Sequence, residues 1–166
     1  MLSDNLDKTN LLILPLKKNY LEEIMAIEVS SFPDPWTSGM FIQELSISIS
    51  RNITVWLASF DKLILAGYTI YWLVADEIQI QKIAVKPEFR RFGLATFIMN
   101  SIFHTFCSEG YKSATLEVRS TNKAAINLYE KLGFMINGVR PSYYSVKNED
   151  ALIMELDLTS VGIQTP

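Results

Sequence analysis

The spacing of hydrophobic residues along the N-terminal part of the chain changes from strand-like to helical. Residues 11–16 form a short apolar run that includes Pro15, which predicts a first strand. Residues 20–29 have helical spacing, with Asn19 placed to cap the helix and Glu22 three positions further on. The predicted apolar face consists of Leu21, Ile24, Met25 and Glu28. Residues 30–35 break this helix because they include two prolines, and a second helix is predicted at 36–45.

The central and C-terminal parts of the chain continue this alternation. Residues 53–85 are rich in β-branched and aromatic residues, and Asp61-Lys62 and Ala75-Asp76 divide them into three predicted antiparallel strands. After Pro87, helical spacing resumes and predicts a long helix that ends near Gly110. We then expect a strand at 114–119, a helix at 123–132 and two final strands at 134–143 and 151–158.

These elements predict an α/β fold with a mixed, mostly antiparallel sheet of about seven strands flanked by about four helices. The chain has 166 residues, of which 49% are hydrophobic, and no Gly/Pro or Ser tract divides it. We therefore expect a single domain over residues 10–158, with a flexible N-terminal tail at 1–9 and a C-terminal tail at 159–166.

Charge and composition exclude several classes of function. The net charge is −3 and the pI is about 5.2, so no direct nucleic-acid partner is expected, and a basic peptide would suit the protein better. Cys107 is the only cysteine, so no internal disulfide is expected, and His104 is the only histidine, so no zinc or other metal site is expected. The apolar stretch at 11–14 is too short for a signal peptide, and no run approaches the ~20 residues of a membrane span. We expect a cytoplasmic protein without a membrane partner.

A strand, a turn and a helix meet at residues 83–96. Gly93 and Ala95 would let the backbone approach an anion, and the N–H groups of the first helical turn would point at it. Arg90 and Arg91 would add positive charge. In the alternative interpretation this is an ordinary strand-to-helix turn, and both arginines are only solvated.

A second segment, 114–134, carries two ionisable candidates. Strand alternation separates Thr115, Glu117 and Arg119 from the apolar face, so Glu117 can face a cleft. Asn122 and Tyr129 are seven positions apart and share a helical face. Alternatively, Glu117 is a surface carboxylate paired with Arg119, and Tyr129 is a core aromatic residue.

The spacing of Arg90, Gly93 and Ala95 resembles the [Gln/Arg]-x-x-Gly-x-[Gly/Ala] motif of the GNAT acetyltransferases. This resemblance implies the GNAT fold, with acetyl-CoA as the cosubstrate. It also implies that backbone groups of Ile83, Ala84 and Val85 meet the acetyl and pantetheine arms. The pyrophosphate would be held by the loop residues Arg91, Phe92, Gly93, Leu94, Ala95 and Thr96.

Residues 28–156 more closely resemble the ribosomal-protein-alanine N-acetyltransferases of the RimI type. The resemblance implies that Glu117 is the general base, that Tyr129 is the general acid and that Asn122 contacts coenzyme A. It also implies a set of four residues that flank the peptide N-terminus, namely Phe32, Trp36, Tyr143 and Tyr144. One departure concerns substrate choice, because Gln81-Lys82 precede Ile83 where these enzymes usually have an asparagine.

The expected function is acetyl transfer from acetyl-CoA to the N-terminal α-amine of a protein, with a ribosomal protein alanine as one candidate acceptor. The amine would attack directly in a ternary complex, because no covalent enzyme intermediate is required. Three alternatives stay open. They are a broad-specificity N-terminal acetyltransferase of the archaeal type, an acetyltransferase for small amines or lysine, and a non-catalytic coenzyme A sensor. The oligomeric state is also open.

Overall fold

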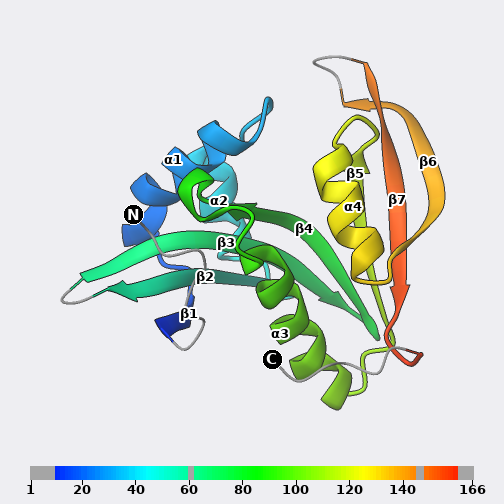
Figure 1. Cartoon of the computed structure of the whole chain (residues 1–166), viewed down its shortest axis with the longest axis horizontal. Coiled ribbons are helices and arrows are strands. Elements are labelled where there is room, and N and C mark those ends of the chain that lie inside the picture. Colours follow the sequence, from blue (N-terminus) through cyan, green and yellow to red (C-terminus); the bar gives the residue numbers. More distant parts are fainter. Residues whose placement is uncertain (1–9, 60–61, 145–147, 161–166) are drawn as a thin grey trace. The chain divides into compact units, whose positions relative to one another are not determined.

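A computed structural model describes residues 10–59, 62–144 and 148–160, and Figure 1 shows its elements in chain order. Within these residues there are seven strands and four α-helices, which confirms the predicted fold class. The N-terminal elements are β1 (Leu11–Pro15), α1 (Leu21–Ser31) and α2 (Ser38–Glu44). The central elements are β2 (Ser50–Ser59), β3 (Lys62–Val74), β4 (Glu77–Val85) and α3 (Leu94–Ser108). The C-terminal elements are β5 (Ser113–Arg119), α4 (Lys123–Lys131), β6 (Met135–Tyr144) and β7 (Glu149–Asp157).

The strands follow the order β1-β2-β3-β4-β5-β7-β6. The pairs β1–β2, β5–β7 and β6–β7 are antiparallel, whereas β4 and β5 are parallel. A parallel pair needs a crossover connection, and α3 lies in the segment that joins β4 to β5. The last two strands exchange order, so that β7 lies between β5 and β6.

The chain divides into two compact units. Within the described residues, the first unit comprises 10–59, 62–70 and 82–98, and the second comprises 71–81, 99–144 and 148–160. Three elements, β3, β4 and α3, run from one unit into the other. The expected N-terminal tail at 1–9 and residues 161–166 of the expected C-terminal tail at 159–166 lie outside the described residues, as does Asp61 of the predicted Asp61-Lys62 break.

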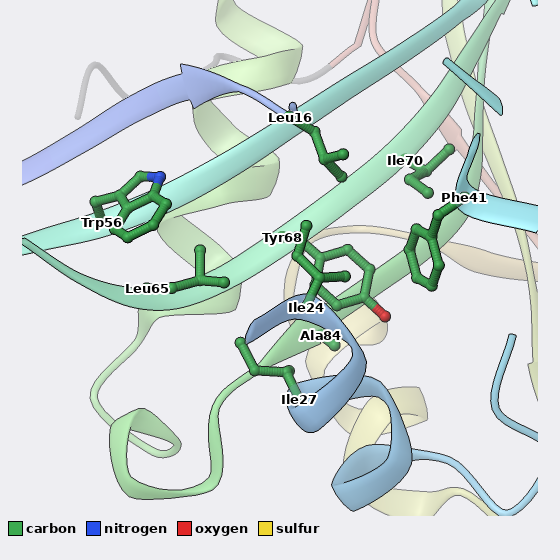
Figure 2. Packing of buried hydrophobic residues seen from close by; sticks show 9 residues of the cluster. All are labelled: Leu16, Ile24, Ile27, Phe41, Trp56, Leu65, Tyr68, Ile70 and Ala84. Atoms are coloured by element: carbon green, nitrogen blue, oxygen red, sulfur yellow. The ribbon is translucent and has the colours of Figure 1, made fainter. Parts of the chain in front are cut away.

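The first unit has its core between α1, α2 and the strands β2 to β4, as Figure 2 shows. Ile24 and Ile27 of α1 and Phe41 of α2 are buried there with Tyr68 of β3. The ring centroids of Phe41 and Tyr68 lie 5.5 Å apart in an edge-on arrangement, which is favourable for aromatic pairs. Of the face predicted for α1, Ile24 and Glu28 are buried and Leu21 and Met25 are partly buried, whereas Ile27 was not predicted. Burial of the apolar side chains stabilises the unit.

The starts of the first two helices differ from each other. The predicted cap Asn19 is wrong, because it lies within the short 3₁₀ helix Lys18–Tyr20, and α1 begins after Tyr20 without a side-chain cap. The Tyr20 N–H already donates to the backbone oxygen of Lys17. In α2, by contrast, the Thr37 hydroxyl accepts the Met40 N–H at 3.3 Å and caps the helix.

The second unit packs α3, α4 and the C-terminal strands around aromatic side chains. Along β5, Ala114, Leu116 and Val118 are buried and the alternate residues are only partly buried, as strand alternation predicted. The Phe134 ring lies 5.9 Å from Phe103 and 5.8 Å from Tyr129 between ring centroids. Among the described residues, no helix has the length and apolar character required to cross a membrane.

Candidate functional site

The strand, turn and helix of the first unit have the backbone geometry of an anion site. Arg91 and Gly93 adopt positive φ values of 69° and 76°, and α3 begins directly afterwards at Leu94. The N–H of Phe97 donates to the Gly93 oxygen, so the N–H groups of residues 94–96 precede the first helical hydrogen bond. A left-handed turn before a helix N-terminus directs several N–H dipoles to one side, where they suit a diphosphate.

The two arginines of this turn have different environments. Arg90 donates from Nε to the Val85 oxygen at 2.9 Å and from Nη2 to the Ser31 hydroxyl at 2.8 Å. Arg90 therefore connects the end of β4 to the end of α1. Arg91 and Arg90 are both exposed, so a solvent anion can reach either side chain. The expectation that both arginines add charge to an anion site stays a prediction.

Glu117 lies in the second unit on the partly exposed face of β5. Its carboxylate forms an ion pair with Arg140 of β6, with 3.1 Å between Oε1 and Nε. The predicted alternative partner, Arg119, pairs instead with Glu149 at 2.8 Å. The Arg119 guanidinium also lies 3.9 Å from the centroid of the Tyr144 ring, which fixes that ring by a cation–π contact. The interpretation of Glu117 as a carboxylate paired with Arg119 is therefore wrong.

The two tyrosines at the end of β6 lie close to these ion pairs. Burial raises the pKa of Tyr143, the charge of Glu117 and a hydrogen bond to it raise the pKa further, and Arg140 lowers it. The rings of Tyr143 and Tyr144 have centroids 5.1 Å apart. The strand is irregular here, with a positive φ at Ser142. The second unit thus brings Glu117, Arg140 and both tyrosines together.

Tyr129 and Asn122 belong to α4. Tyr129 is buried, and burial raises its pKa to about 12, with a further contribution from Tyr144. Its hydroxyl consequently keeps its proton at neutral pH. Asn122 is the N-cap of α4, and its Oδ1 accepts the Ala125 N–H at 3.2 Å. The side-chain nitrogen of Asn122 is then the part with which it can bind a ligand.

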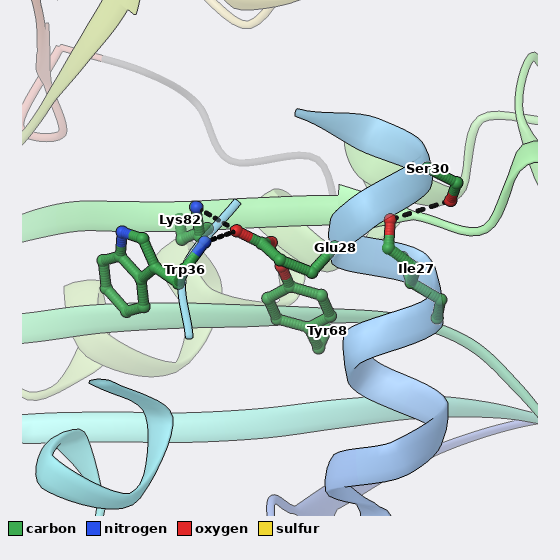
Figure 3. Close-up of polar contacts among 6 residues, drawn as sticks. All are labelled: Ile27, Glu28, Ser30, Trp36, Tyr68 and Lys82. Carbon is green, nitrogen blue, oxygen red and sulfur yellow. Dashed lines mark hydrogen bonds and ion pairs between the residues drawn. The ribbon is translucent and has the colours of Figure 1, made fainter. Parts of the chain in front are cut away.

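One group of residues in the first unit was not predicted from the sequence. Glu28 is completely buried, and its carboxylate accepts hydrogen bonds from Lys82, from the Tyr68 hydroxyl and from the Trp36 backbone (Figure 3). Burial raises the pKa of Tyr68, and the charge of Glu28 raises it further. The available signal was a carboxylate on the apolar face of α1. Phe32 and Trp36, expected to flank the acceptor, are both partly buried beside this group.

Comparison with known proteins adds to this geometry. Residues 21–134 match the acetyltransferase (GNAT) family. A Bacillus subtilis protein, named as a candidate ribosomal protein bS18-alanine N-acetyltransferase, is 35% identical over 147 residues, which are 89% of this chain and 95% of that protein. The ribosomal protein bS18-alanine N-acetyltransferase of Salmonella typhimurium is 33% identical over 135 residues, which are 80% of this chain and 88% of the relative.

Solved structures agree with these relatives. The crystal structure of the ribosomal-protein-S18-alanine N-acetyltransferase from Escherichia coli matches with a TM-score of 0.78 and 30% identity. The match covers 94% of this chain and 99% of that one. The family match, the two relatives and this structure each span most of the chain. The chain therefore belongs to the GNAT family of acetyltransferases and is an acyltransferase.

Proposed function

We propose that this enzyme transfers an acetyl group from acetyl-CoA to the N-terminal α-amine of a protein, with the alanine at the start of a ribosomal protein as the first candidate acceptor. The observation that carries the proposal is the similarity to enzymes named for that reaction, which extends over most of both chains. An acceptor from the ribosome would place the reaction in the cytoplasm.

Acetyl-CoA would be bound by the first unit. The N–H groups that follow Arg91 and Gly93 suit the diphosphate, because that turn is left-handed and leads into a helix N-terminus. The exposed Arg91 side chain would add charge to this contact. The end of β4, Ile83-Ala84-Val85, would meet the acetyl and pantetheine arms by backbone hydrogen bonds. The resemblance to the RimI type implies that Asn122 contacts coenzyme A, and its side-chain nitrogen is the part that can do so.

The acceptor must lose a proton before it can react, because an α-amino group has a pKa of about 7.7 to 8.0. In our proposal Glu117 takes that proton, directly or through water. Its carboxylate is 27% exposed and can therefore be reached from solvent. The amine nitrogen then forms a bond to the thioester carbonyl carbon, while a backbone N–H of residues 83–85 stabilises the carbonyl oxygen.

The carbon–sulfur bond then breaks while the nitrogen releases its second proton to solvent to form the amide, and coenzyme A leaves as a thiolate that needs a proton. We assign this proton to Tyr129, whose pKa of about 12 keeps the hydroxyl protonated at neutral pH. Solvent afterwards returns the proton to Tyr129. The resemblance to the RimI type further implies that Phe32, Trp36, Tyr143 and Tyr144 flank the acceptor peptide.

Two measurements test this function. Mass spectrometry of protein N-termini from cells with and without the gene should show one or a few N-termini that lose acetylation. The purified enzyme with acetyl-CoA should acetylate a peptide that begins with the N-terminal alanine of ribosomal protein bS18. It should not acetylate the same peptide with a blocked N-terminus but an internal lysine. Turnover of only the lysine or of free polyamines would reject an α-amine acceptor, and no turnover of any amine would reject the enzymatic mechanism.

A further inference from the structure

The buried Glu28 connects both ends of the segment between α1 and α2. Pro33 and Pro35 have no N–H group, so Phe32, Asp34 and Trp36 supply the only backbone donors of residues 32–36. The Phe32 N–H donates to the backbone oxygen of Glu28 at 3.0 Å. The Trp36 N–H donates to the carboxylate Oε1 of the same residue at 2.6 Å. Two of the three backbone N–H groups of this segment therefore donate to oxygen atoms of Glu28.

Lys82 completes this arrangement from β4. Its side chain is only 8% exposed and forms an ion pair with the Glu28 carboxylate (Figure 3). The same ammonium lies 4.2 Å from the centroid of the Phe32 ring and 4.7 Å from that of Trp36. Both distances are within the range of cation–π attraction. The Lys82 ammonium thus contacts both aromatic rings, and the Glu28 carboxylate forms an ion pair with that ammonium.

We propose that Lys82 is a positioning residue for the acceptor, which fixes the orientation of the Phe32 and Trp36 rings against the incoming peptide. The proposal rests on the function proposed above, because it takes these two rings as part of the acceptor site. Glu28 has the supporting role of neutralising the ammonium, since a buried cation without a partner would be strongly unfavourable.

The details of the contact favour this role over that of a simple core ion pair. Core pairs are satisfied by the charges themselves, and neither ring is needed to compensate Lys82 once Glu28 is present. Both rings are only partly buried, so part of each stays available to a ligand. Lys82 also directly precedes Ile83, the first residue of the strand end proposed to meet the acetyl arm. The residue that orients the rings is therefore a direct chain neighbour of that strand end.

The test compares three variants with the exposed Lys62→Met as a matched control. Lys82→Met removes the charge and keeps the length of the side chain, and it should raise the KM for the acceptor peptide by about two- to thirtyfold. The KM for acetyl-CoA should stay within about twofold, since the two rings beside the ammonium belong to the proposed acceptor site. Lys82→Arg, which retains a cation, should keep most of the acceptor affinity.

The double variant Glu28→Gln/Lys82→Met separates positioning from stability. Removing both charges leaves no unpaired buried ion, so its melting temperature should recover relative to Lys82→Met. The rings still lack their cation, so the KM for the peptide should stay high. If the KM recovers together with the melting temperature, or if Lys82→Met leaves the KM unchanged, Lys82 does not position the acceptor.

A measurement that needs no acceptor separates this inference from the proposed function. Hydrogen exchange of peptides covering residues 32–36 should be faster in Lys82→Met than in the wild type or in Lys62→Met. Unchanged exchange would show that Lys82 does not hold the segment and would overturn the inference even in an active enzyme. Faster exchange together with no acetylation of any peptide by the wild type would instead refute the proposed acceptor and leave the positioning of the rings established.

Discussion

Gly67 of β3 offers the sharpest test of the geometry at the proposed acetyl-CoA site. A Cβ atom added at this position would lie 2.7 Å from the backbone oxygen of Ala84 and 3.5 Å from the Cα of Val85. The clash is with backbone, so no side chain can rotate to relieve it, and the end of β4 must move instead. Gly67→Ala should therefore displace the strand end proposed to meet the acetyl and pantetheine arms.

The expected size of the effect follows from this contact. Forcing one extra carbon into a close-packed position costs about 1–3 kcal/mol. For a chain of this size each kcal/mol lowers the melting temperature by roughly 2–4 °C, so a decrease of about 2–12 °C is expected. The neighbouring hydrogen bond from the Lys86 N–H to the Ala66 oxygen, 2.8 Å long, should weaken as the two strands separate. Acetyl-CoA affinity should fall with it.

Differential scanning calorimetry and titration calorimetry with acetyl-CoA would measure both effects. Gly39→Ala in α2 is the matched control, because its added Cβ would meet only the Thr37 hydroxyl at an ordinary 3.7 Å. That variant should be as stable as the wild type or more stable by up to about 1 kcal/mol, since alanine favours a helix. A Gly67→Ala protein with wild-type stability and acetyl-CoA affinity would refute the close approach of β3 to β4.

Three further predictions concern the proposed site. Gly93→Val places a β-branched residue at a φ of 76°. The resulting strain of about 1–2 kcal/mol should weaken acetyl-CoA binding by roughly 5- to 30-fold while the fold is retained. An unchanged acetyl-CoA affinity in titration calorimetry would contradict this prediction. Tyr129→Phe should lower kcat by about 10²- to 10⁴-fold with little change in acetyl-CoA affinity. The folded pKa of Tyr129, about 12, exceeds the ordinary value of 10, so the contribution of the hydroxyl to stability is complete below pH 10 and is lost as the pH rises through 12. In alkaline unfolding Tyr129→Phe should not show that loss of stability. Full turnover by Tyr129→Phe would show that Tyr129 is only a core aromatic residue and not the general acid. Glu117→Gln should have a low turnover rate near pH 7, and its rate should recover relative to the wild type above the amine pKa of about 8. The comparison requires that the variant binds acetyl-CoA normally. An equal defect from about pH 6.5 to 9.5 would show that Glu117 only positions the acceptor.

Features set by neighbours in the chain were predictable from the sequence. The burial of Ala114, Leu116 and Val118 follows from strand alternation, and the end of α4 follows from Gly133, whose φ is 95°. The turn around Gly93 also depends on adjacent residues, and Gly93 has a positive φ that glycine adopts readily, whereas the anion site itself stays a prediction. Local spacing carries enough information for these features because each depends on only a few residues.

Features set by distant residues were not predictable in the same way. The ion pair of Glu117 with Arg140 depends on β7 lying between β5 and β6, and sequence spacing does not specify that order. Arg119, two positions from Glu117, was the expected local partner, but it forms its ion pair with Glu149. The environment of Glu28 likewise depends on Tyr68 and Lys82, which are 40 and 54 positions away. The helical pattern could place Glu28 on the buried face but could not supply its partners.

The two glutamate–cation pairs differ in a way that bears on which carboxylate can act as the base. The Glu28 pair with Lys82 is 0% and 8% exposed, and opening it would leave buried ions without partners. The pair of Glu117 with Arg140 is 27% and 55% exposed, and such pairs contribute only about 0–1 kcal/mol. Glu117 can therefore exchange Arg140 for the ammonium of an acceptor at little cost, whereas Glu28 cannot release Lys82. This contrast favours Glu117 over Glu28 for the proposed proton transfer, and it is consistent with the proposed role of Glu28 in neutralising Lys82.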